Sequence, residues 1–121
     1  MTLELELDLY LRARFTLIVL VTAEEERALQ TIKSVCEHAK RPSLSWDVAD
    51  GFQPLTAGAS APSSARDAKT ALESIDKAEG ETVFVLKDFH DCWKNFELKR
   101  KLRGLAQRLK FTKKSIIVTT P

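Results

Sequence analysis

An aspartate follows a strongly apolar segment of this sequence, in a pattern that can hold magnesium. Residues 83–86 read Val-Phe-Val-Leu, and Lys87 and Asp88 come next. In enzymes that hydrolyse nucleotides, a buried strand ending in aspartate helps to position Mg²⁺. The glutamate that usually follows and activates water is replaced by Phe89. We therefore expect Asp88 to be a vestigial Walker-B-like aspartate, or simply an exposed or capping residue, with no catalytic role.

No phosphate-binding loop accompanies this aspartate. The four glycines are not spaced as G-x-x-x-x-G-K-[ST], the pattern whose backbone N–H groups wrap a phosphate. After the first predicted strand the sequence reads VTAEEER, so Glu24, Glu25 and Glu26 occupy a helix start that otherwise attracts anions. Three carboxylates repel a triphosphate. We expect this chain to be no enzyme and to bind no nucleotide cofactor.

The cysteines and histidines form two close pairs that do not favour a metal site. Cys36 and His38 would point about 200° apart on a helix, so they cannot chelate one ion. His90 and Cys92 lack the spacing of a zinc knuckle, and no third group is evident to orient a nucleophile. We expect Cys36 in the core, His38 on the surface and no bound metal. Two cysteines make no disulfide framework, which favours a reducing cytoplasm.

A basic segment is the strongest remaining signal. Residues 94–114 carry nine Lys or Arg and a single acid, although the net charge of the chain is only +2. Leucines at helical spacing give residues 94–110 a buried stripe. A polar face lies opposite or beside that stripe, formed by Arg100, Arg103, Gln107, Lys110 and Lys114. Such a face can contact an acidic protein or a phosphate backbone, although an ordinary solvated helix face explains it equally simply.

The remaining pattern predicts an α/β domain. Leucine and acid alternate over residues 3–11, which fits a strand or a helix, and the residue types favour a helix. Continuous apolar runs predict four strands, at 15–22, 44–48, 82–89 and 115–120. The first strand is expected to be buried on both faces. Amphipathic helices between the strands imply a parallel four-stranded sheet in a three-layer αβα arrangement.

Local signals mark where the helices and one loop should lie. Thr22 and Glu25 form a predicted capping box for the helix that ends near Arg41-Pro42. Ser64 and Asp67 predict the cap of a helix that ends at Gly80. Residues 50–65 hold two of the four prolines and two of the four glycines. We expect them to form a mobile surface loop.

The segments RARFTLIVLVTAEEERALQTI, VFVLKDFHD and LRGLAQRLKFTKKSIIVTTP together carry a family resemblance. They resemble the amino-terminal domain of an AAA-family ATPase encoded in cyanobacteria and some algal plastid genomes. The resemblance covers nearly the whole chain except residues 50–65. It implies a degenerate, AAA-like half of the P-loop NTPase fold, with a leading helix. In its sheet, the first strand would neighbour the fourth, then the third, then the second.

The resemblance also implies a function outside catalysis. Residues 1–121 would form a single ATPase-like domain at the amino terminus of a longer chain, whose ATPase module would hold ATP and Mg²⁺. We expect a regulatory or protein-interaction role, with that module or neighbouring subunits as partners. The alternative is a nucleic-acid-binding module that uses the 94–114 helix, and a small hydrolase built around Asp88 and His90 is a third possibility. No apolar run approaches the roughly 20 residues of a membrane helix, so no membrane contact is expected.

Overall fold

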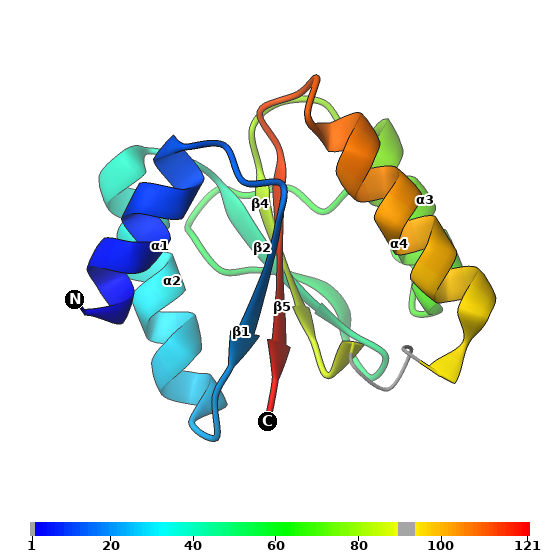
Figure 1. Cartoon of the computed structure of the whole chain (residues 1–121), viewed down its shortest axis with the longest axis horizontal. Helices are drawn as coiled ribbons and strands as arrows, with labels where there is room; N and C mark the ends of the chain where they lie inside the picture. Colours follow the sequence, from blue (N-terminus) through cyan, green and yellow to red (C-terminus); the bar gives the residue numbers. More distant parts are fainter. Residues whose placement is uncertain (1, 90–93) are drawn as a thin grey trace.

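The computed structural model describes residues 2–89 and 94–121, which form a sheet between two pairs of helices (Figure 1). One face of the sheet is covered by α1 (Leu3–Arg12) and α2 (Glu25–Ala39). The other face is covered by α3 (Ala68–Lys77) and α4 (Phe96–Leu109). Two separate hydrophobic clusters fill the spaces on either side of the sheet. This arrangement agrees with the predicted three layers and with the predicted leading helix.

The sheet has five strands and is mixed, so the prediction of four parallel strands is wrong. The strands are β1 (Leu17–Val21), β2 (Ser43–Asp47), β3 (Gly51–Pro54), β4 (Val83–Lys87) and β5 (Ser115–Thr120). They lie in the order β1-β5-β4-β2-β3. All neighbouring pairs are parallel except β2 and β3, which are antiparallel. The order of the four parallel strands is the one that the family resemblance implies.

The additional strand β3 lies inside the segment 50–65 that was predicted to be a loop. The Asp47 carboxylate accepts hydrogen bonds from two backbone N–H groups of the following turn, at 3.0 and 2.7 Å. Gly51 then adopts a φ of 69°, which glycine tolerates best, and Phe52 is buried. An Asp-Gly pair between two strands is a hairpin signal that the surrounding prolines and small residues obscured. The mobility of the rest of this segment stays a prediction.

Strand β1 lies at the edge of the sheet, as the implied strand order places it, but one of its faces is largely exposed, which corrects the prediction that both faces are buried. It pairs only with β5, and the side chains of Val19 and Val21 are 50% and 70% exposed. Ile18 and Leu20 pack into the cluster under α1 and α2, whereas Leu17 is the only β1 residue packed against the other cluster. A continuous apolar run predicts a strand but does not determine which of its faces is covered by helices.

Most predicted helix boundaries agree with the structure to within a few residues, but the predicted cap of α2 does not form. The Thr22 hydroxyl accepts from the N–H of Glu24 at 3.0 Å, and α2 begins only at Glu25, so the predicted capping box is absent. Asp67 caps α3 as expected, by accepting from the N–H of Thr70 at 2.9 Å. That helix ends at Lys77 and not at Gly80. None of the helices in the described part of the chain has the length and apolar character to cross a membrane.

Lys114 lies in the core, and this corrects its assignment to the basic helix face. Its side chain is only 3% exposed. The ammonium group donates to the carbonyl oxygens of Ile75, Asp76 and Ala78 at the end of α3, at 2.8, 3.1 and 2.5 Å. The last carbonyls of a helix have no partner within it, so a cation there satisfies them and complements the helix dipole. Lys114 therefore anchors the start of β5 to α3.

We expect Lys114→Met to lower the free energy of unfolding by about 2 kcal/mol, because three largely buried carbonyl groups lose their donor. Equilibrium unfolding in urea at neutral pH measures this difference. Lys113→Met is the matched control: Lys113 is exposed and its side chain has no hydrogen-bond or ion-pair partner among the described residues. Equal destabilisation by the two substitutions would contradict this role of Lys114.

Candidate functional site

The carboxyl edge of the sheet is where ligands bind in open α/β folds, and Asp88 lies there. It directly follows β4 and is exposed, with a φ of 57°. With Thr22, Glu25 and Thr119 it lines a hollow of about 110 Å³. Small-molecule sites usually have volumes of about 300–1,000 Å³. This hollow is therefore much smaller than a nucleotide site.

The charges at this edge do not favour a phosphate. Glu25 and Asp88 both line the hollow, and none of its described lining residues is a lysine or arginine. The nearest lysine in sequence, Lys87, is engaged with Asp47 at 3.2 Å. The arrangement can attract a single cation weakly, but it offers no donor to stabilise a transferring phosphoryl group.

The cysteine and histidine residues that can be placed do not form a site. Cys36 is fully buried, and burial raises the pKa of its thiol to about 11, which keeps it protonated and unreactive. His38 is exposed, as predicted. Over residues 2–89 and 94–121, no three His, Cys, Asp or Glu side chains gather as metal ligands would. His90 and Cys92 lie outside the described residues, and so does any pairing of His90 with Asp88.

The outer face of α4 brings together most of the predicted interaction residues. Arg100, Arg103, Gln107 and Lys110 are all exposed. At about 100° per residue they lie within one arc of the helix, opposite the buried leucines 102, 105 and 109. None of the four side chains has an ion-pair or hydrogen-bond partner within the part of the chain that the structure describes. We call these four residues the basic face of α4.

The neighbouring side of α4 differs because its charges are paired. Lys101 contacts Glu73 at 3.3 Å, and Arg108 contacts Asp76 at 3.0 Å. Glu97 forms a third pair with α3. These pairs join α4 to α3, and the hydrogen bond from the Thr16 hydroxyl to the Ala106 carbonyl joins it to the start of β1. The basic face is thus held on a helix that is fixed on its other sides.

Two aromatic side chains flank the basic face. Phe96 begins α4 and is 84% exposed, and Phe111 follows its end and is 92% exposed. Phe96 falls within the same arc as the basic face by helical spacing. Phe111 was missed from the sequence because it lies one position beyond the predicted helix; extending the spacing by one residue would have placed it there. Large apolar side chains exposed beside a functional surface often mark contact sites.

Comparison with known proteins identifies the family. The family model described as SpoVK-like AAA ATPase, N-terminal domain matches residues 3–121. The AAA domain-containing protein ycf46 of Guillardia theta is 36% identical over 118 residues, which cover 93% of this chain and 22% of that protein. Its counterparts in Trieres chinensis and Pyropia yezoensis are each 35% identical, over 93% of this chain and 23% of theirs.

No solved structure matches the chain. The chain spans less than a quarter of the length of the curated relatives named above. The match over residues 3–121 nevertheless confirms the resemblance seen in the separate sequence segments. The chain therefore belongs to the family of SpoVK-like AAA ATPase N-terminal domains.

Proposed function

We infer that this domain is a non-catalytic, regulatory protein-interaction module of a cytoplasmic AAA-family ATPase. Its basic face on α4 contacts the ATPase module of the same protein, a neighbouring subunit or a client. One observation carries this proposal: four polar side chains without partners in the described chain, three of them cations, project from one arc of a fixed helix. Exposed Phe96 and Phe111 lie at its two ends.

The residue types suit a protein partner. Arginines and aromatics contribute most of the binding energy in many interfaces, since both combine apolar area with directed interactions. Carboxylates on a partner would pair with Arg100, Arg103 and Lys110. Burial of each phenylalanine ring against the partner would contribute about 2 kcal/mol. The exposed apolar edge of β1, at Val19 and Val21, offers a second contact region.

The carboxyl edge of the sheet supports a degenerate nucleotide site. Its hollow of about 110 Å³ carries Glu25 and Asp88 where a phosphate would need cations. In this proposal, ATP and Mg²⁺ bind only in the ATPase module of the full-length protein. The domain contributes contacts, and Asp88 retains the position of a magnesium ligand without its function.

Nucleotide binding provides one test of this proposal. We expect the 121-residue chain to bind Mg-ATP with a dissociation constant of about 1 mM or more. The site is too small for a nucleotide and has no cationic side chains to bind the phosphates. Isothermal titration calorimetry with and without Mg²⁺ measures this affinity. Submillimolar binding that is lost in Asp88→Ala would contradict the proposal that this domain is non-catalytic.

The basic face provides another test. In the full-length protein, the triple substitution Arg100→Glu, Arg103→Glu and Lys110→Glu should weaken association of this domain with its protein partner at least tenfold, since three attractive contacts become repulsive. Binding of the 121-residue chain to the separately produced remainder of the protein, measured by biolayer interferometry, tests the intramolecular case. Size-exclusion chromatography with light scattering tests contacts between subunits.

The control for this experiment reverses three cations elsewhere. Lys33, Arg66 and Lys77 lie outside α4, and their conversion to glutamate changes the net charge by the same amount. Circular dichroism melting shows whether both triple variants remain folded. If the control weakens association as strongly as the α4 variant, overall charge and not the basic face governs binding.

Nucleic-acid binding is the second candidate, favoured by the exposed rings of Phe96 and Phe111 beside the basic face. Aromatic stacking on bases together with phosphate contacts is the mode by which many proteins bind single strands. This alternative predicts affinity for single-stranded probes that falls steeply with salt and is lost when Arg100, Arg103 and Lys110 become glutamate. Fluorescence anisotropy without detectable binding, or with salt-independent binding, would remove it.

A further inference from the structure

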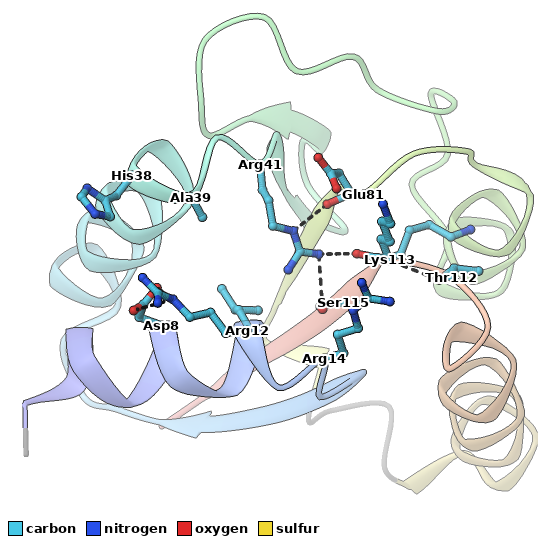
Figure 2. A pocket seen from close by; sticks show the side chains of 12 residues that line it. Asp8, Arg12, Arg14, His38, Ala39, Arg41, Glu81, Thr112, Lys113 and Ser115 are labelled. Carbon is cyan, nitrogen blue, oxygen red and sulfur yellow. Dashed lines mark hydrogen bonds and ion pairs between the residues drawn. The ribbon is translucent and has the colours of Figure 1, made fainter.

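A larger hollow, of about 420 Å³, lies at the amino edge of the sheet, opposite the edge that carries Asp88 (Figure 2). It is bounded by the end of α1, the segment after α2, and the turn that joins α4 to β5. Because β1, β4 and β5 are parallel, their first residues meet at this edge. The volume falls within the range of about 300–1,000 Å³ that is usual for small-molecule sites.

Arg41 is the fixed group of this hollow. Its Nε donates to the carbonyl oxygen of Glu81 at 2.9 Å, and Nη2 donates to the carbonyl of Lys113 and to the hydroxyl of Ser115. All three acceptors are uncharged, and Arg41 has no ion pair within residues 2–89 and 94–121. Burial lowers the pKa of the guanidinium, although an arginine stays protonated at neutral pH. The side chain is therefore an oriented, only partly solvated cation, and the nearby carboxylate of Glu81 offsets its charge without forming an ion pair.

Other charged groups make the hollow basic. Arg14 and Lys113 line it and have no side-chain partner in the described chain, whereas Arg12 pairs with Asp8 at 3.1 Å. Lys114 also lines the hollow, but its ammonium group is engaged with α3. The other four cations outnumber the two carboxylates, those of Asp8 and Glu81, so the hollow has an excess of two positive charges. Figure 2 shows Arg12, Arg14, Arg41 and Lys113 around the same opening, although they come from three distant segments.

The backbone at Arg14 is an unusual place for an arginine. It follows the end of α1 with a φ of 62°, in the left-handed region that glycine prefers at this position of a helix end. Its N–H donates to the carbonyl of Leu11 at 3.1 Å, which closes the helix. Glycine at this position would thus stabilise the fold as well as arginine or better. The side chain of Arg14 is therefore not needed for folding and can bind a ligand.

We propose that this hollow binds a small organic phosphate, a phosphate monoester, with Arg41, Arg14 and Lys113 as the groups that hold the phosphate. Guanidinium N–H groups form charge-assisted hydrogen bonds to phosphate oxygens. Three of the five N–H donors of Arg41 are already engaged, which leaves the two on Nη1 for a phosphate, and the fixed side chain loses little freedom on binding. The hollow exceeds the size of a phosphate ion, and Leu11 and Ala39 in its wall provide apolar contact for the organic part. This site is independent of the function proposed for α4.

Titration of the ¹⁵N-labelled 121-residue chain with glycerol 3-phosphate tests the proposal. We expect saturable shifts in the NMR signals of Arg14, Arg41, Lys113 and Ser115, with weaker binding of inorganic phosphate and none of glycerol. Arg14→Gly and Lys113→Gln should each weaken binding about tenfold, because each removes one charge-assisted contact. Arg14→Gly should leave the chain as stable as before, which separates ligand binding from folding.

Lys110→Gln is the matched control, since it removes one exposed cation that lies on α4 and outside this hollow. Absence of saturable shifts with glycerol 3-phosphate would overturn the proposal. So would equal weakening by Lys110→Gln and Lys113→Gln, which would indicate general charge attraction. If glycerol 3-phosphate binds no more tightly than inorganic phosphate, the proposal that the hollow recognises an organic phosphate is wrong.

The monoester can be soluble or can be the headgroup of a lipid, and a second arm distinguishes these sources. Sedimentation with phosphatidylcholine vesicles that contain phosphatidic acid, reduced by Arg14→Gly, would identify the lipid headgroup as the source. Binding of glycerol 3-phosphate without sedimentation would identify a soluble ligand. Either result supports the proposed phosphate chemistry of the hollow.

Discussion

The pairing of β5 with both of its neighbours holds this domain together. The last strand of the described chain lies between β1 and β4, so its backbone forms hydrogen bonds on both sides. Ile116 and Val118 point into the cluster under α3 and α4, whereas Ile117 points into the cluster under α1 and α2. Without residues 115–120, β1 with its two helices would have no connection through the sheet to β4. Both hydrophobic clusters therefore depend on this one strand.

The contacts at the start of β5 explain how that strand is positioned. Lys114 binds the carbonyl end of α3, and Arg41 binds the carbonyl of Lys113 and the hydroxyl of Ser115. Two cations thus fix consecutive residues where β5 enters the sheet. Their partners are mainly carbonyl oxygens, so each interaction satisfies backbone acceptors without neutralising the charge. This separates the roles of two basic residues that look alike in the sequence: Lys114 is enclosed, whereas Arg41 borders an open hollow.

The two edges of the sheet have opposite electrostatic character. Carboxylates of Glu25 and Asp88 line the small hollow at the carboxyl edge, and an excess of cations lines the larger hollow at the amino edge. In folds of this kind the carboxyl edge is the usual place for an anionic ligand. The separate basic face of α4 adds a third charged region, on the side of the helix opposite its buried leucines.

Much of this structure was readable from the sequence. Apolar runs located the four parallel strands, leucine spacing located α4, and the same spacing placed Arg100, Arg103, Gln107 and Lys110 opposite the leucines. These features depend on local periodicity, which a sequence displays directly. The spacing also suggested Lys114 for the basic face, and there it failed, because residue 114 lies beyond the helix. The exposed face of β1 and the hairpin at Gly51 were not predicted for a related reason, since both depend on which elements become neighbours.

The sequence by itself determined the family, the order of all elements except β3, and the identity of one charged helix face. Only the tertiary structure decided which cations are enclosed and which are open to a ligand. Arg14, Arg41 and Lys113 are separated by up to 99 residues and share a hollow only because parallel strands start at one edge. Burial and partners are properties of assembled surfaces, and no local spacing encodes them.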